Sequence, residues 1–253
     1  MLPVDSPKWP ELMCDLGSAQ PIADALKEAY EIVKAADGDQ AQINQAVSIA
    51  SGLIGDLYHQ QSTYSGTAAA IPHLVHFAEL ANLKQKSYIL VMIAYMNYDH
   101  AGSHAPDELD EAYSDAVNEA CAMATHLLQH EVLTKDEQES LFETVAFIRG
   151  TCFNAIQYQG EGIKTCTGCK ADLMVSVAKD GFEISFEDGD SVPVQPVQDL
   201  AIEFKKPRHR ELAYYFKIAQ VGKRDLFLDW LSNYLGTFVC PACKTEQQID
   251  YER

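Results

Sequence analysis

The chain has 253 residues, of which 47% are apolar, enough to bury a core without support from disulfides. The first ten residues lack the basic and apolar regions of a secretory signal, and no run approaches 18 apolar residues, so we expect a cytoplasmic protein without a membrane span. The 37 acidic and 19 basic residues give a formal net charge of −18. Such a surface repels phosphates, which argues against direct binding of nucleic acid.

The negative charge is concentrated in the N-terminal part of the chain. Residues 1–160 hold 22 acidic and 7 basic residues, a net charge of −15, whereas residues 161–253 hold 15 and 12, a net charge of −3. An acidic surface attracts a protein partner with a basic surface. The alternative is that this charge only keeps the protein soluble.

Residues 1–160 show helical periodicity, with apolar residues recurring every three or four positions between short polar turns. Thr134 and Glu137 have the spacing of a capping box. No segment alternates as a strand does, so we expect this part to be entirely helical. Paired in order, the helices repeat about every 40 residues, as in stacked hairpins of the HEAT type; a generic helical bundle is the alternative. The expected helices cover residues 21–36, 41–58, 67–81, 86–97, 106–130 and 134–149.

The pattern changes near residue 160. Apolar side chains alternate from Phe182 to Phe186 after an Asp-Gly turn, which predicts a β-hairpin. We therefore divide the chain into a helical body, residues 1–160, and a second module, residues 161–253. The expected elements of the module are strands at 173–178 and 182–186, a loop at 187–207, helices at 208–220 and 223–235, and a last strand within 244–251.

Four cysteines of this module form two Cys-x-x-Cys pairs, each with a small third residue and each followed by lysine. The pairs read Cys166-Thr-Gly-Cys169 and Cys240-Pro-Ala-Cys243, with 70 residues between them. Each such turn presents two thiolates to one ion, and zinc takes four ligands in a tetrahedron. We therefore predict one structural zinc ion per chain, in a small β module that resembles a zinc ribbon interrupted by a hairpin and two helices.

Other readings of these cysteines remain open. A redox Cys-x-x-Cys is expected to stand alone between a strand and a helix. A catalytic zinc needs an open ligand position and a nearby general base, and no His-x-Glu motif accompanies these pairs. In a cytosolic chain, cysteines are more often reduced or metal-bound than disulfide-bonded. We expect the other three, Cys14, Cys121 and Cys152, to be buried apolar residues.

The polar segment 55–66 joins two apolar helices and carries a distinctive motif. Tyr58-His59-Gln60 and Thr63-Tyr64 lie within it, and an alanine-rich helix with an internal Pro-His follows. With the ending Leu235-Gly-Thr-Phe-Val-Cys-Pro-Ala-Cys243, the chain resembles bacterial HEAT-repeat-like proteins that end in a Cys-x-x-Cys zinc-ribbon module. Gln61-Ser62 stands where that group has a small glycine.

Some members of that group look like immunity proteins encoded beside secreted bacterial toxins. The resemblance therefore implies a cytosolic immunity protein that occludes a toxin, and a nuclease is the preferred target because its basic substrate groove complements acidic helices. Exposed aromatic residues such as Tyr58, Tyr64 and Tyr113 are the expected anchors. The alternative for segment 55–66 is that it caps helix ends. The candidate contact residues are Tyr58, His59, Gln60, Tyr64, Asp107, Glu108, Asp110 and Glu111.

Motifs of catalysis are missing from the sequence. It contains no nucleophile elbow, no phosphate-binding loop, no dinucleotide-binding glycine pattern and no His-Glu-x-x-His. His73 and His76, three residues apart, could face a common site, but no third ligand is evident. We therefore expect a protein without enzymatic activity. A helical scaffold for an endogenous partner and a zinc-dependent enzyme are the alternatives.

Overall fold

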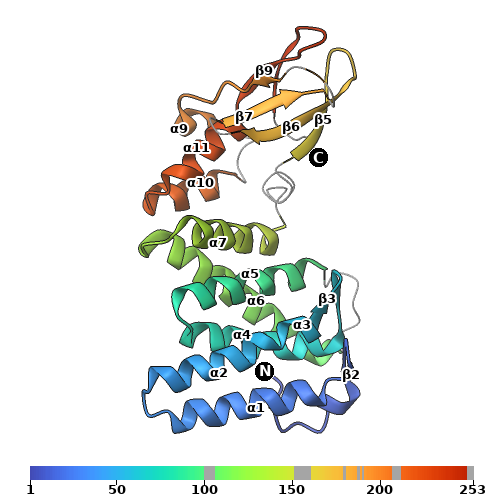
Figure 1. Cartoon of the computed structure of the whole chain (residues 1–253), viewed down its shortest axis with the longest axis vertical. Coiled ribbons are helices and arrows are strands. Elements are labelled where there is room, and N and C mark those ends of the chain that lie inside the picture. The colour runs from blue at the N-terminus through green and yellow to red at the C-terminus, as the bar shows by residue number, and fades with distance from the viewer. Residues whose placement is uncertain are drawn as a thin grey trace. The chain divides into compact units, whose positions relative to one another are not determined.

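The computed structural model is mainly helical, with small antiparallel sheets concentrated toward the C-terminus, as the sequence predicts (Figure 1). It describes residues 1–99, 106–150, 161–178, 181–186, 189, 191–206 and 212–249. The chain divides into two compact units: Met1–Leu127 with Val132–Gly150, and Leu128–Glu131 with Thr151–Arg253. None of the helices in the described ranges is long and apolar enough to cross a membrane.

The first unit is built from consecutive helices joined by short turns. Helix α1 packs on α2 and α4 on α5, which are the first two predicted hairpins, and α2–α4 and α5–α7 contacts continue the stack (Figure 1). The predicted pairing of residues 106–130 with 134–149 is not among these main contacts, because α7 packs chiefly on α5. Large apolar side chains fill the space between them; Trp9, Phe77 and Phe142 are at most 1% exposed. The elements are η1 Trp9–Glu11, α1 Gln20–Ala35, α2 Gln40–Gly52, α3 Ile54–Leu57, α4 Ser65–Leu80, α5 Leu83–Asp99, α6 Asp107–His130 and α7 Lys135–Ile148.

Side-chain caps explain where several of these helices begin. The Thr134–Glu137 capping box is present at the start of α7, as predicted. The Asp39 carboxylate accepts a hydrogen bond from the Ala41 backbone N–H (2.9 Å) and caps α2. Helix α5 begins three residues before the predicted position. There the Asn82 side chain accepts a hydrogen bond from the Gln85 N–H (3.0 Å), so the polar residues ahead of the apolar run belong to its first turn.

The prediction of an entirely helical first part is wrong in two places. Strands β1 (Met13–Cys14) and β2 (Gly17–Ser18) form one hairpin, and β3 (Tyr58–His59) and β4 (Ser62–Thr63) form another. In place of the single helix expected over 41–58, the structure has two helices, α2 and the short α3, and β3 begins at Tyr58. Strands of two residues are too short to show an alternating pattern, so periodicity cannot reveal them.

The second unit contains a four-stranded antiparallel sheet, β5-β6-β7-β8, and a two-stranded ribbon, β9-β10. The predicted hairpin is confirmed as β6–β7, and the predicted last strand as β10. The loop predicted at 187–207 contains β8 and α9, and neither β5 nor β9 was predicted from the sequence. The elements are β5 Glu161–Thr165, β6 Asp172–Ala178, β7 Gly181–Ser185, β8 Val192–Pro193, α9 Leu200–Glu203, α10 Leu212–Val221, α11 Asp225–Tyr234, β9 Thr237–Val239 and β10 Glu246–Gln248.

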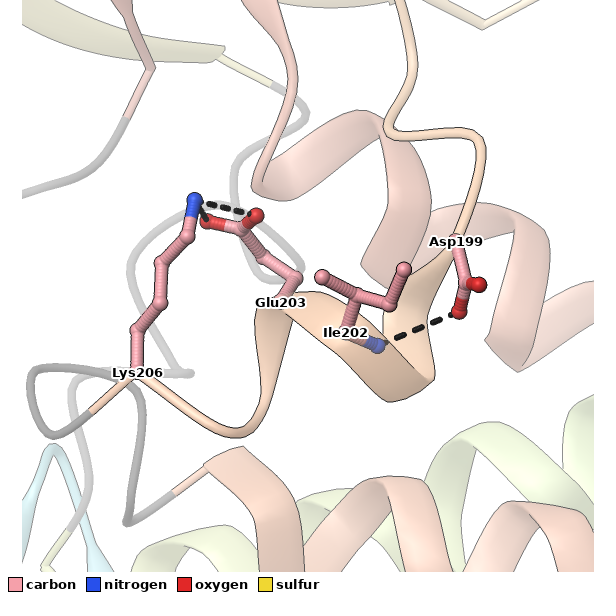
Figure 2. Close-up of polar contacts among 4 residues, drawn as sticks. All are labelled: Asp199, Ile202, Glu203 and Lys206. Atoms are coloured by element: carbon pink, nitrogen blue, oxygen red, sulfur yellow. Dashed lines mark hydrogen bonds and ion pairs between the residues drawn. The ribbon is translucent and has the colours of Figure 1, made fainter.

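Helix α9 is short and is held by polar contacts at both ends (Figure 2). The Asp199 carboxylate accepts a hydrogen bond from the Ile202 N–H (3.1 Å). The buried Glu203 carboxylate accepts from the Lys206 ammonium at 2.7 and 2.6 Å, one bond to each oxygen. Burying a carboxylate is unfavourable unless a partner compensates its charge, and Lys206 supplies that charge.

A continuous apolar core joins the sheet, the ribbon and α11. It includes the first cysteine of each Cys-x-x-Cys pair, so the cysteines lie at the edge of a packed interior. The buried members are Cys166, Leu173, Val175, Phe182, Ile184, Val194, Tyr234, Leu235, Phe238, Cys240 and Ile249.

Candidate metal centre

Two turns with the same backbone geometry carry the four cysteines, one between β5 and β6 and the other between β9 and β10. In each, the first cysteine donates its N–H to the carbonyl five residues later, and the lysine after the second cysteine donates its N–H to the first cysteine's carbonyl. That lysine is left-handed in both turns, with φ of 64° and 63°. In the first turn the Cys166 N–H lies 2.8 Å from the Ala171 oxygen and the Lys170 N–H 3.0 Å from the Cys166 oxygen. In the second turn the Cys240 N–H lies 2.9 Å from the Thr245 oxygen and the Lys244 N–H 3.0 Å from the Cys240 oxygen.

The two turns bring their four sulfur atoms together. All four lie within 4.8 Å of one another, and the closest pairs across the turns are Cys166–Cys243 at 3.6 Å and Cys169–Cys240 at 3.9 Å. A disulfide would need a separation of about 2.05 Å. Four thiolates about 2.3 Å from a central ion, the usual zinc–sulfur distance, lie about 3.8 Å apart in a tetrahedron. The arrangement therefore fits one metal ion rather than two disulfides.

The set predicted from the sequence is the set that the fold assembles. Among the described residues, these cysteines are the one group of three or more His, Cys, Asp or Glu side chains placed to share a metal ion. Cys166 and Cys240 are buried, whereas Cys169 and Cys243 are exposed. Four thiolates complete a tetrahedron, so such a site has no open ligand position for water or substrate.

Gln247, on β10, supports the cysteines but was not singled out from the sequence. Its amide N–H donates to the Cys166 sulfur (3.2 Å), and its amide oxygen accepts from the Thr167 backbone N–H (3.0 Å). In the second turn, Thr245 Oγ1 lies 3.2 Å from the Cys243 sulfur. These contacts orient the ligands, as outer-shell groups do in metal sites. The sequence signal for both residues is only that they lie within four residues of Cys243.

Gly168 is required by the close approach of the two turns. A Cβ atom at this position would lie 2.5 Å from Thr245 Oγ1 and 3.0 Å from the Cys243 sulfur. The small third residue of the first pair therefore does more than allow its own turn. It makes room for the second pair.

The environments of the thiols differ. The backbone N–H of Cys169 stabilises the Cys166 thiolate and, with the Gln247 amide, lowers the Cys166 pKa to about 6 despite the opposing effect of desolvation. At Cys169, the Ala171 N–H lowers the pKa, but desolvation and hydrogen bonds with the other three thiols outweigh it and raise the pKa to about 11. Thiolates this close repel one another, so a shared cation would stabilise the fully ionised set.

The partner-binding candidates of segment 55–66 divide into anchored and exposed side chains. The Tyr58 hydroxyl donates to the Asp99 carboxylate, and the Tyr64 hydroxyl donates to Asp15 Oδ1 (2.9 Å). His59 and Gln60 are exposed. The two tyrosine hydroxyls therefore hold the segment in place, while the tip of its hairpin faces solvent.

The acidic candidates lie in the first turn of α6 and just after it. Asp107, Glu108, Asp110 and Glu111 are all exposed, and Glu108 pairs with Lys8. Tyr113, expected as an exposed anchor, is only 8% exposed and donates to Asn97 Oδ1 (3.0 Å). That expectation is wrong because Tyr113 faces the apolar side of α6.

His73 is enclosed and both of its ring nitrogens are engaged. Nε2 lies 2.8 Å from the Leu2 carbonyl oxygen, and Nδ1 lies 2.9 Å from the Tyr30 hydroxyl. A carbonyl can only accept, so Nε2 carries the proton and Nδ1 accepts from Tyr30. Burial lowers the His73 pKa to about 4. His76 stacks on the Tyr30 ring, 5.4 Å between centroids. His73 therefore has no nitrogen left for a metal ion.

The remaining cysteines follow the sequence prediction in part. Cys14 is buried, as expected, and its thiol donates to the Ser18 carbonyl (3.4 Å). Cys121, on α6, is only half-buried, so that expectation is wrong. Cys152 lies outside the described residues.

Compared with models of protein families, with curated proteins and with solved structures, this chain matches none of them.

Proposed function

We propose that this chain is a non-catalytic protein-binding protein, in which a structural zinc ion holds the second unit together and the acidic first unit binds a basic protein. The sequence resemblance implies that this basic protein is a toxin, which the chain would neutralise by binding it. Zinc is the proposed metal because it favours four thiolates in a tetrahedron and does not alter the redox state of its ligands.

The distribution of charge carries the binding proposal. Residues 1–160 have a net charge of −15, against −3 for the rest of the chain. The carboxylates that open α6 point to solvent, and Asp107, Asp110 and Glu111 enter none of the salt bridges found among the described residues. Charges left exposed in this way add little to folding, but they accelerate the encounter with a basic partner.

The test reverses the charge of the α6 carboxylates. Asp107, Glu108, Asp110 and Glu111 are replaced together by lysine, and association with the product of the neighbouring gene is followed by stopped-flow fluorescence. We expect association to slow by about tenfold or more at low salt, with a smaller change in dissociation, because long-range attraction acts mainly on encounter. Salt should reduce the wild-type rate, since charges are screened over about 10 Å at 0.1 M.

A matched variant reverses four exposed carboxylates of α1 and the turn after it: Asp24, Glu28, Glu31 and Asp37. It changes the net charge equally at another place. An equal slowing in both variants would show that only net charge matters. An association rate indifferent to salt and to both variants would contradict the proposal and leave the acidity as a solubility device.

A further inference from the structure

We infer that the two small hairpins of the first unit form the contact platform for the basic partner, and that they bind a segment in which cationic side chains alternate with apolar ones. The platform comprises residues 13–18, with β1 and β2, and residues 56–63, with β3 and β4. This inference rests on the proposed function and names the surface that performs it.

The platform is held rigidly although its strands are very short. The Asp15 N–H donates to the Asp56 carbonyl (3.0 Å), which joins the two hairpins directly. The Met13 N–H donates to Ser65 Oγ (2.9 Å), at the first residue of α4. A Cβ atom at Gly66 would lie 2.7 Å from the Met13 carbonyl oxygen, so β1 rests against the start of that helix. The hairpins are thus docked on the helical core.

The turn of the second hairpin is strained. Gln60 and Gln61 are its two loop residues, and both are left-handed, with φ of 50° and 61°. Two-residue hairpins favour Asn-Gly or Gly-Gly here, because in this conformation a Cβ atom crowds the neighbouring backbone, and glycine has none. Among the described residues, no other two consecutive non-glycine residues both have a positive φ. Strain of this kind persists where the side chains have a use, and both amides are exposed.

The other hairpin presents apolar side chains to solvent. Met13 is 52% exposed and Leu16 is 72% exposed. Exposed apolar groups on a fixed backbone are suited to be buried by a partner, since no ordering of the loop opposes binding. The exposed Gln60 and Gln61 amides of the other hairpin can pair with a partner's main chain.

The charge of the platform selects the partner. Asp15 and Asp56 are its charged carboxylates, and the chain contains no lysine or arginine at 9–26 or at 35–83. His59 Nδ1 lies 3.9 Å from Asp15 Oδ2 and can pair with it when protonated. Apolar side chains and carboxylates, without lysine or arginine in these segments, complement a segment that carries both arginine or lysine and leucine-like residues. The acidic start of α6 then attracts the partner from a distance, and the platform supplies the contact.

A synthetic ten-residue peptide of alternating leucine and arginine is the probe, and a serine–arginine peptide of equal charge is its control. Affinity is measured by titration calorimetry with the full chain. We expect the leucine–arginine peptide to bind about tenfold more tightly than the serine–arginine peptide, and Leu16→Ser to abolish that difference. Hydrogen exchange should show protection in residues 56–63.

Relieving the backbone strain at Gln60 and Gln61 distinguishes a role in partner contact from a purely structural role. Replacing Gln60 and Gln61 together by glycine should raise the midpoint of thermal unfolding, because the strain is relieved, and should weaken peptide binding by about tenfold. Asp37→Gly is the matched control. Asp37 is also left-handed (φ 42°), but it follows the C-terminus of α1 and lies outside both platform segments, 13–18 and 56–63. It should raise the midpoint without weakening binding.

Each contrary result has its own meaning. Protection confined to the first turn of α6, or binding unchanged by Leu16→Ser, would overturn the platform and leave the proposed function standing. Equal binding of both peptides would also overturn it, because charge alone would then explain the affinity. If neither peptide binds, the inference is wrong, and the stopped-flow experiment with the α6 variant still decides the proposed function independently.

Discussion

Gly168 shows how a single residue decides whether the cysteines can meet. Its missing side chain leaves room for Thr245 Oγ1, which would lie 2.5 Å from an added Cβ. Gly168→Ala should therefore separate the two turns and lower metal affinity by about tenfold or more, since displaced ligands lose their tetrahedral geometry. Competition with a chromophoric chelator measures the affinity.

Ala242 occupies the matching position of the second pair and is exposed. Ala242→Gly serves as the control and should leave metal affinity unchanged within about twofold, because the Ala242 side chain is exposed. If Gly168→Ala binds metal as tightly as the unmodified chain does, the turns do not approach each other as described.

His73 makes the stability of the first unit depend on pH. Burial holds its pKa at about 4 in the folded protein, below the ordinary value of 6.5. Above pH 6.5 the residue is neutral in both states. As the pH falls from 6.5 to 4, the unfolded chain takes up a proton that the folded chain excludes, so roughly 3 kcal/mol of stability is lost across this window.

His73→Asn removes this titration. Urea denaturation at several pH values should show a shallower loss of stability for the variant between pH 6.5 and 4, although the variant is less stable at neutral pH. Parallel curves for the two proteins would show that His73 is charged in the folded state, contrary to its contacts with Leu2 and Tyr30.

Among the elements, the docking of β1 against α4 depends on Gly66. An added Cβ would lie 2.7 Å from the Met13 carbonyl oxygen and 2.9 Å from the Ala19 Cβ. Gly66→Ala should destabilise the protein by about 1–3 kcal/mol because backbone, not a flexible side chain, must move. Gly52, the last residue of α2, has no such neighbour within 4 Å.

Gly52→Ala is thus the matched substitution and should stabilise the protein by up to about 1 kcal/mol, the helix propensity of alanine over glycine. Chemical denaturation measures both values. Equal effects of the two substitutions would mean that Gly66 is not in contact with the first hairpin.

The helices were predictable because apolar periodicity is a property of each segment alone. The burial of Tyr113 was predictable too, because Tyr113 shares the helical spacing of the buried residues Leu109, Ala116 and Ala120. The expectation that it is exposed overlooked this spacing. The four cysteines were predictable because each turn is a local motif. The role of Gln247 was not, because it depends on how β10 packs on a turn 80 residues earlier in the chain.

At the scale of the whole molecule, the chain contains an acidic helical unit and a second unit whose four cysteines are placed to share a metal ion. The cysteines at the edge of the second unit's core come from distant parts of the chain, so metal binding and folding of that unit are coupled. Removing the ion with a chelator should increase hydrogen exchange in residues 161–249 more than in residues 1–150. The acidic unit has its own core and does not depend on the ion.

The metal content of the purified full-length chain, measured by native mass spectrometry together with elemental analysis, tests the central claim most directly. We expect one zinc ion per chain, bound with all four cysteines deprotonated, and its loss in Cys166→Ser and Cys240→Ser. A metal-free chain whose four thiols react freely, or one that carries two disulfides after preparation under reducing conditions, would contradict it.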